Sequence, residues 1–297
     1  MKEFYDVVVI GSGIAGMTAA IYLKRGGLSV LIIEKNVPGG QLNKINSIDN
    51  YPGFVKTDGP TLAAELFSQV RNLDIEYLFD NVDNVDLNSS NKKIVTGGCT
   101  IYCKYVVIAT GRISRKLFDN DERYIGKGIS YCALCDGNFY KEKEVIVVGG
   151  ANSAVEEALY LSNICKKVII VYRGSKLKAE EKMIDKLNNT DNIEVLYETE
   201  IKEYIIKDNK LDKVLLSNNK TLEVDGIFMA IGGIPNSEIF NLEKYNDYIV
   251  VDKDLKTSID KVYACGEIIK KDIYQLTTAV GEASIVANNI IKEINNK

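Results

Sequence analysis

Histidine is absent from this chain of 297 residues. Its absence excludes Ser-His-Asp and Cys-His catalysis, and it excludes zinc sites that use an imidazole ligand. A proton that moves during a reaction must therefore come from a carboxylate, a tyrosine, a lysine, a cysteine or water. Arginine is scarce, because only six of the 37 basic residues are arginine. Few side chains can therefore supply the bidentate fork that suits a phosphate group.

Long hydrophobic runs are also absent, and none approaches the roughly 20 residues of a transmembrane helix. The chain starts with MKEFYDVVVIGSG, which lacks the n-region and cleavage site of a signal peptide. The net charge of −4 gives no case for binding nucleic acid or an anionic membrane surface. We therefore expect a cytoplasmic protein, in which a cysteine pair is more often metal-binding or catalytic than structural.

The N-terminal segment reads as strand, glycine-rich turn, helix and strand, in which GSGIAG follows the apolar run DVVVI. Gly11, Gly13 and Gly16 have the G-x-G-x-x-G spacing, and Glu34 ends the second strand. The glycines let the backbone turn tightly and let a pyrophosphate reach the helix N-terminus. An acid at the end of the second strand can accept a ribose hydroxyl. The segment predicts a dinucleotide site, and the alternative is a tight turn without a ligand.

The same order of elements recurs at 144–174, EVIVVGGANSAVEEALYLSNICKKVIIVYRG. Further apolar strands run into glycine turns at 106–111, 227–236 and 262–267, and a helical segment closes the chain. Two βαβ units about 140 residues apart predict two related nucleotide-binding domains of α/β type.

The stretch SYCALCDGNFY places Cys132 and Cys135 two residues apart, directly before Asp136. A zinc site would need four ligands, which Cys99 and Cys103 could complete. A structural disulfide is a second reading, and a redox catalyst is the third. A thiolate shuttling electrons needs a proton source, and a neighbouring carboxylate supplies one in a chain without histidine. The remaining cysteines lie in apolar stretches and are expected to be small buried hydrophobes: Cys165 and Cys265.

The order of motifs resembles the low-molecular-weight thioredoxin reductases. It runs through GSGIAG, GGQL, NYPG, ATG, CALCDG, a second glycine-rich turn and ACGE, and it covers nearly the whole chain. The resemblance implies an α/β fold with two Rossmann-like three-layer nucleotide-binding domains, the second inserted in the first. FAD would bind a discontinuous domain formed by residues 1–115 and 240–297. The inserted domain, residues 116–239, would carry the redox-active CxxC, and the protein would be a homodimer.

The resemblance also implies a set of FAD contacts, and this chain departs from the family pattern near two of them. The acid after ACG is usually aspartate and is Glu267 here, while the arginine usually found before the final glutamine is Tyr274. Asn50 has an alternative role in turn formation ahead of Pro52. The implied contacts are Gly11, Gly13, Gly16, Glu34, Gly40, Gln41, Asn50, Thr110, Gly111, Gly266, Glu267 and Gln275.

The resemblance gives each member of the cysteine motif a role. Cys135 would face the flavin, Cys132 would attack the disulfide of thioredoxin, and Asp136 would protonate the departing thiolate. A different class of function also stays open, in which the chain is a flavin-binding redox sensor with the CxxC as a switch. Asp136 argues against the sensor, because turnover needs a proton donor beside the pair and a switch does not. Turnover with oxidised thioredoxin separates the two functions.

The prediction of the electron donor depends on the second glycine-rich turn. Its three G-x-G-x-x-G positions are occupied by Gly149, Ala151 and Ala154. A methyl group at the middle position stands where backbone should meet a pyrophosphate. NADPH-using relatives carry His-Arg-Arg after the next strand, and this chain reads VYRGSKLK, with Arg173 alone of that cluster. These departures make NADPH doubtful as a cofactor and favour the ferredoxin-dependent flavin thioredoxin reductases. The alternatives are an NAD(P)H site with altered contacts and, for GGANSA itself, a helix-capping turn with Asn152 and Ser153 near the helix start.

Overall fold

The computed structural model describes residues 4–45 and 48–296. The chain forms two compact units, Met1–Ile113 with Ile234–Lys297, and Ser114–Gly233. The motif-based bounds lie two residues later at the first crossing and six later at the second, and their outer ends at 1 and 297 lie outside the described residues. The chain passes between the units in β7 (Arg112–Ser114) and β16 (Gly233–Pro235), which pair with each other.

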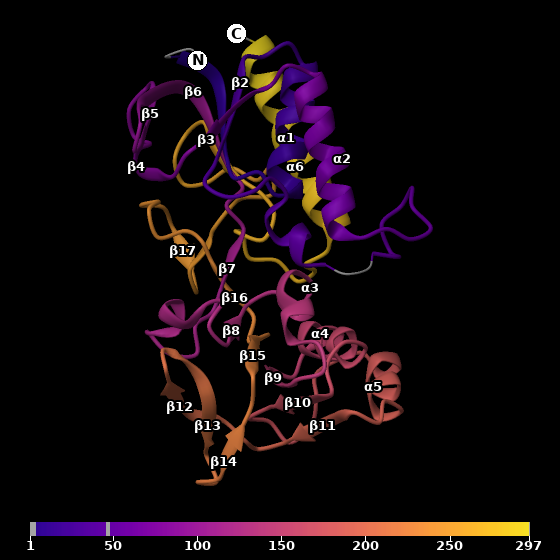
Figure 1. The fold of residues 1–297 in the computed structure, drawn as a ribbon. Helices are drawn as coiled ribbons and strands as arrows, with labels where there is room; N and C mark the ends of the chain where they lie inside the picture. Colours follow the sequence, from indigo (N-terminus) through magenta and orange to yellow (C-terminus); the bar gives the residue numbers. More distant parts are fainter. Residues whose placement is uncertain (1–3, 46–47, 297) are drawn as a thin grey trace. The chain divides into compact units, whose positions relative to one another are not determined.

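The first unit contains a mixed sheet in the order β3-β2-β1-β6-β5-β4, with β19 also paired to β6. Helices α1 and α2 pack on each other, and α6 packs on α1, as Figure 1 shows. These elements are β1 (Phe4–Ile10), α1 (Ile14–Arg25), β2 (Val30–Glu34), α2 (Gly59–Asn72), β3 (Glu76–Phe79), β4 (Val82–Asp86), β5 (Lys92–Thr96), β6 (Thr100–Ile108), β19 (Val262–Ala264) and α6 (Leu276–Asn295), with the small pair β17 (Lys244–Tyr245) and β18 (Tyr248–Ile249) and the 3₁₀ turn η1 (Gly40–Lys44).

Strand β6 shows how the sequence sets this sheet. Its first residues alternate between exposed and buried where they pair antiparallel with β5, and Tyr105–Ile108 are all buried where the strand lies between β1 and β19 in parallel. Continuous burial is the pattern of a parallel strand covered on both faces. The carboxyl ends of β1 and β6 therefore lie side by side, which places the turns at Gly11 and Gly111 next to each other.

The second unit has a parallel sheet in the order β11-β10-β9-β15-β8 and an antiparallel sheet in the order β12-β13-β14. Side chains of β9 alternate between two cores, because Val145 and Val147 pack with α4 while Ile146 and Val148 pack with β12 and β13. The elements are η2 (Asp121–Tyr124), β8 (Ile129–Ser130), α3 (Ala133–Asp136), η3 (Gly137–Tyr140), β9 (Glu144–Val148), α4 (Asn152–Ser162), β10 (Lys167–Val171), α5 (Glu181–Asn188), β11 (Ile193–Leu196), β12 (Ile201–Lys207), β13 (Lys210–Leu216), β14 (Thr221–Glu223) and β15 (Gly226–Met229).

Both units thus have the predicted α/β character, with a βαβ opening whose glycine-rich turn joins a buried strand to a helix. The expected closing helix is α6. Across residues 4–45 and 48–296, none of the helices is long and apolar enough to span a bilayer.

Candidate functional site

The first glycine-rich turn needs two of its glycines for the fold and leaves the third facing open space. A Cβ on Gly11, which has φ +102°, would lie 2.4 Å from the Ala109 oxygen, and a Cβ on Gly16 would lie 1.9 Å from the Gly11 oxygen. A Cβ on Gly13 would meet nothing within 4 Å. Helix α1 starts there without a side-chain cap or an acid in its first turn. Its backbone N–H groups therefore suit a pyrophosphate.

Glu34 is fixed at the same turn by three donors. Its carboxylate accepts the Ser12 amide at 2.9 Å, the Ser12 hydroxyl at 3.2 Å and the Asn36 amide at 2.9 Å. The Tyr77 hydroxyl in turn donates to Ser12 Oγ at 2.8 Å. Burial raises the pKa of Tyr77 to about 12, so the phenol stays protonated and keeps this donor role at neutral pH. The half-buried carboxylate is thus held where an acid of a dinucleotide site accepts ribose hydroxyls.

Gly40 also lies at this turn. A Cβ on Gly40 would come 3.6 Å from Gly13 Cα, and Gly39 forms a parallel bridge with Gly13. The structure therefore gathers five of the expected FAD contacts at one turn of the backbone. They are Gly11, Gly13, Gly16, Glu34 and Gly40. Open backbone at Gly13, uncapped N–H groups and a fixed carboxylate fit the pyrophosphate and ribose of FAD.

Two further expected contacts bond to backbone carbonyls of the first unit that lie far away along the chain. Gln41 donates to the Arg112 carbonyl at 2.9 Å, next to Gly111, which has φ +60°. The Thr110 hydroxyl donates to the Asn236 carbonyl at 2.8 Å. These bonds place Gln41 beside the turn at Gly111.

Asn50 donates to Gln275 Oε1 at 3.3 Å, so these two expected contacts lie together at the start of α6. The residues after Asn50 also form the turn that its sequence context suggested, because the Phe54 amide donates to the Tyr51 carbonyl. Gly266 has φ +85°, and Glu267 beside it is half-buried.

Several residues at this site carried no signal in the sequence. Ser12 and Tyr77 orient Glu34, and Arg112 lies over two tyrosine rings. The Gly266 amide donates to Glu282 Oε2 at 2.9 Å, and Lys271 pairs with the same carboxylate at 2.8 Å. The position of Arg112 directly after the ATG turn was the one available hint.

The cysteine pair forms a disulfide at the start of the short helix α3. Cys132 is the N-cap residue, and the Cys135 amide donates to Cys132 Sγ at 3.1 Å. Such a donor stabilises negative charge on sulfur and so favours Cys132 as the thiolate after reduction. Cys132 is buried, with 8% of its surface exposed, whereas Cys135 is exposed to solvent.

A buried carboxylate anchors the residue before the pair. Asp121 is fully buried and accepts the hydroxyls of Tyr131 at 2.9 Å and Tyr204 at 2.8 Å, and the amides of Leu117 at 2.7 Å and Phe118 at 3.2 Å. Burial raises the pKa of both tyrosines, and the bonds to Asp121 raise it further. Tyr131 therefore ties the cysteine loop to β12.

Three of the other cysteines are buried thiols with raised pKa values. Burial raises the pKa of Cys103 to about 12, of Cys165 to about 11 and of Cys265 to about 12. A protonated buried thiol is a poor nucleophile. The expectation of small buried hydrophobes is confirmed for Cys165 and Cys265. Within the described part of the chain, no three Cys, Asp or Glu side chains gather as metal ligands.

A tyrosine ring packs against one residue of the second glycine-rich turn. A Cβ on Gly150 would lie 2.4 Å from the ring of Tyr172, and a Cβ on Gly174 would lie 2.6 Å from the same ring. The ring therefore fits against backbone that only glycine leaves open. Ala151 is the N-cap residue of α4, without a side-chain cap. Asn152 and Ser153 are the first two residues of α4, where the helix-capping alternative places them. The side chain of Asn152 exchanges two hydrogen bonds with Glu180, and no side chain caps this helix.

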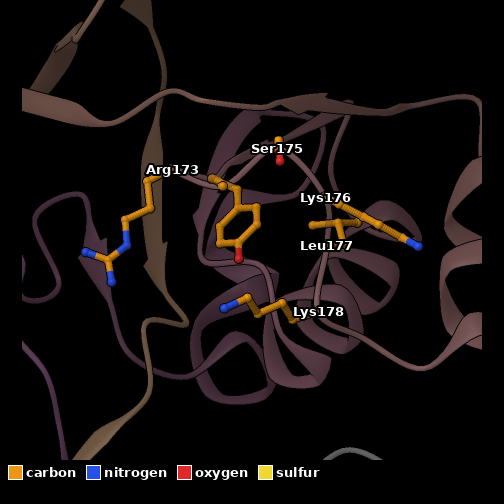
Figure 2. Close-up of a pocket in the computed structure, with 7 residues that line it drawn as sticks. Arg173, Ser175, Lys176, Leu177 and Lys178 are labelled. Atoms are coloured by element: carbon orange, nitrogen blue, oxygen red, sulfur yellow. The ribbon is translucent and has the colours of Figure 1, made fainter.

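A pocket of about 560 Å³ is lined by the segment 172–178, which follows β10. Arg173, Lys176 and Lys178 are its cations, and all three are exposed. Figure 2 shows Arg173 and Lys176 pointing to opposite sides of the pocket. Arg173 and Lys176 therefore do not converge on one point, as the fork of an arginine pair would.

Comparison with known proteins gives consistent matches over the full chain. The profile of the family described as pyridine nucleotide-disulphide oxidoreductase matches residues 5–283. A thioredoxin reductase of Ureaplasma parvum is 38% identical, over 96% of each protein. The crystal structure of Lactococcus lactis thioredoxin reductase in its FR conformation has a TM-score of 0.92 at 35% identity, over 99% of this chain and 100% of that one. A ferredoxin-flavin thioredoxin reductase from Clostridium acetobutylicum has a TM-score of 0.56 at 29% identity, over 99% of each chain.

Proposed function

The chain belongs to the thioredoxin reductases, within the pyridine nucleotide-disulphide oxidoreductase family, and we propose that it reduces thioredoxin through FAD with reduced ferredoxin as the electron donor. It is a flavoprotein disulfide oxidoreductase. The first unit is the proposed FAD-binding domain, and the second is a nucleotide-type domain that carries the cysteines and has a degenerate nucleotide site. Homodimerisation and a cytoplasmic location, which the resemblance implies, belong to the same proposal.

FAD can take up electrons singly or in pairs and supplies a pair to a disulfide. The chain's own groups then carry the exchange. Reduction breaks the Cys132–Cys135 bond, and Cys132 as thiolate attacks the thioredoxin disulfide to form a mixed disulfide. The departing thioredoxin sulfur takes a proton from Asp136. The Cys135 thiol then loses its proton and attacks Cys132 Sγ, and the second thioredoxin sulfur leaves and takes up a proton. The internal disulfide re-forms, and thioredoxin is released as a dithiol.

The observation that carries the ferredoxin proposal is the Tyr172 ring against Gly150. A ring against Gly150 leaves less room for a dinucleotide to approach the turn, because the pyrophosphate needs close contact with the backbone there. Two further features support it: the methyl group of Ala151 at the middle glycine position, and the glycine at 174, where NADPH-using relatives carry an arginine. The match to a ferredoxin-flavin thioredoxin reductase is in keeping with this donor.

An anaerobic titration tests the donor directly. We expect stoichiometric NADPH and NADH to leave the flavin absorbance unchanged, and reduced ferredoxin to bleach it and sustain thioredoxin reduction. Bleaching by either nucleotide within seconds would rule ferredoxin out as the required donor. As a control, Lys143→Ala removes an exposed cation of the second unit outside the pocket, and it should give the same titrations with nucleotide and with ferredoxin as the wild type.

A second candidate is NAD(P)H as donor, and the pocket at 172–178 favours it. Arg173 and Lys178 are cations beside the glycine-rich turn, where they could contact a phosphate group. If this candidate holds, Arg173→Ala should raise the KM for NADPH at least tenfold and leave turnover at saturation unchanged. The ferredoxin proposal expects no effect of that substitution on ferredoxin-driven turnover.

A further inference from the structure

Ser130 lies at the centre of the hydrogen bonds around the cysteine motif. It ends β8 and is 1% exposed. Its Oγ lies 2.7 Å from Asp136 Oδ2, 3.3 Å from the Cys132 oxygen and 3.1 Å from the Cys132 nitrogen, which donates to it. One buried hydroxyl therefore touches the proposed acid and both polar backbone atoms of the proposed nucleophile.

The two ends of this arrangement are held by different elements. Ser130 pairs in register with Phe228 of β15, which is fully buried in the core. Asp136 is the last residue of α3, and its amide donates to the Cys132 carbonyl at 3.1 Å. The Ser130 hydroxyl thus bridges the fixed strand that enters the motif and the helical turn that leaves it.

A serine hydroxyl has one proton to donate and two lone pairs to accept with, and Ser130 has two acceptors in reach. When Asp136 is ionised, the hydroxyl donates to Oδ2 at 2.7 Å. When Asp136 is protonated, its O–H donates to Ser130 Oγ, and the serine proton turns to the Cys132 oxygen at 3.3 Å. In both states Oγ still accepts the Cys132 amide. Rotation of one hydroxyl therefore satisfies both protonation states without a water molecule.

We propose that Ser130 is a positioning residue that holds Asp136 in both its protonated and its ionised state. The inference rests on the proposed role of Asp136 as the acid. In the step concerned, the bond between Cys132 and the thioredoxin sulfur forms and the thioredoxin disulfide breaks. The proton of the Asp136 carboxyl passes to the departing sulfur. Asp136 becomes a carboxylate, the Ser130 proton turns from the Cys132 oxygen to Oδ2, and Ser130 gains and loses no proton.

The test isolates this step from the electron donor. The full flavoprotein is reduced with dithiothreitol, desalted without oxygen and mixed rapidly with oxidised thioredoxin, and the reaction is stopped with an alkylating agent that counts thioredoxin thiols. We expect Ser130→Ala to slow thiol formation about tenfold, the size of one lost hydrogen bond to a charged group. Ser130→Thr keeps the hydroxyl and should retain most of the rate. Thr199→Val removes another buried hydroxyl of this unit, which bonds to the Tyr197 carbonyl, and should leave the rate unchanged.

A double-mutant cycle separates positioning from mere packing. In the Asp136→Asn background, Ser130→Ala should add no further slowing, because the group it positions is gone. A solvent deuterium isotope effect on the step should likewise be smaller in Asp136→Asn and unaffected by adding Ser130→Ala. These readouts compare proteins that all bind flavin, so a general loss of folding would be detected first as lost flavin.

The possible results distinguish a failure of the inference from a failure of the proposed function. Ser130→Ala at the wild-type rate, with Asp136→Asn slow, overturns the inference and leaves the proposed function intact. A tenfold effect that persists in the Asp136→Asn background overturns it as well, because Ser130 would then act without Asp136. A wild-type rate in Asp136→Asn alone overturns the acid assignment in the proposed function and, with it, the inference.

Discussion

The guanidinium of Arg112 lies 5.5 Å from the centre of the Tyr274 ring. Tyr248 flanks the same group at 5.8 Å. Tyr274 stands where the resembled family carries an arginine, so the positive charge reaches this region from β7 instead of from the start of α6. Stacking on aromatic rings orients a guanidinium and adds attraction to it.

Removal of this guanidinium should weaken flavin binding. We expect Arg112→Ala to raise the dissociation constant of FAD roughly tenfold, because the charge beside Gly111 and the two ring contacts are lost together. Arg112→Lys should be intermediate, and Arg71→Ala, which removes an exposed arginine of α2, should have no effect. Flavin fluorescence released on dilution measures the change. Equal retention in all four proteins would show that Arg112 has no part in the site.

The glycines of the first turn should respond in opposite ways to the same substitution. Gly13→Ala should fold normally, because its Cβ meets no atom within 4 Å, and yet should purify with little flavin. Gly16→Ala should lose about 3 kcal/mol of stability or more, because its Cβ would overlap the Gly11 oxygen at 1.9 Å. Urea unfolding and the flavin-to-protein absorbance ratio distinguish the two. Full flavin content in Gly13→Ala would argue against a pyrophosphate at this turn.

The two cysteines of the motif should each be required for turnover. Cys132→Ser and Cys135→Ser should abolish thioredoxin reduction while flavin stays bound, because the first unit holds the proposed FAD site. Cys99→Ser alters a half-buried thiol of the first unit and should keep normal turnover. Steady-state thioredoxin reduction with each donor gives the comparison. Normal activity in either variant of the pair contradicts the exchange sequence.

The buried carboxylate of Asp121 should contribute strongly to stability. Asp121→Ala leaves two tyrosine hydroxyls and two backbone amides without their acceptor, and we expect a loss of about 3 kcal/mol or more. Asp119→Ala, at an exposed position two residues earlier, should change stability by less than about 0.5 kcal/mol. Urea unfolding followed by circular dichroism measures both. A small loss in Asp121→Ala would mean that water enters and replaces the carboxylate.

Local pattern predicts much of this fold. Apolar runs that end in glycine turns predict β1, β6, β9 and β15, and the spacing of Gly11, Gly13 and Gly16 predicts the turn before α1. The redox chemistry of the cysteine motif can also be predicted from the sequence, because it depends on residue types and their spacing. Contacts between distant segments cannot be predicted in this way. Tyr77 reaches Ser12 across 65 positions and Thr110 reaches Asn236 across 126, and only folding brings such residues together. The role of Ser130 could not be predicted for a related reason, because a serine before a cysteine pair carries no signal and only the folded chain places its hydroxyl between three polar atoms.

Because β7 pairs with β16, the two ends of the second unit, residues 114–233, lie side by side. On one side of the crossing the Asn236 amide donates to the Gly111 carbonyl at 3.0 Å, and on the other the Arg115 amide donates to the Gly232 carbonyl at 3.0 Å. Each unit thus closes its own gap with its own hydrogen bond. A domain whose two ends lie side by side can be inserted into another domain, or removed from it, without disrupting the fold of the receiving domain. The second unit, residues 114–233, can therefore diverge or be exchanged over evolutionary time while the first unit, which carries Glu34, keeps its fold.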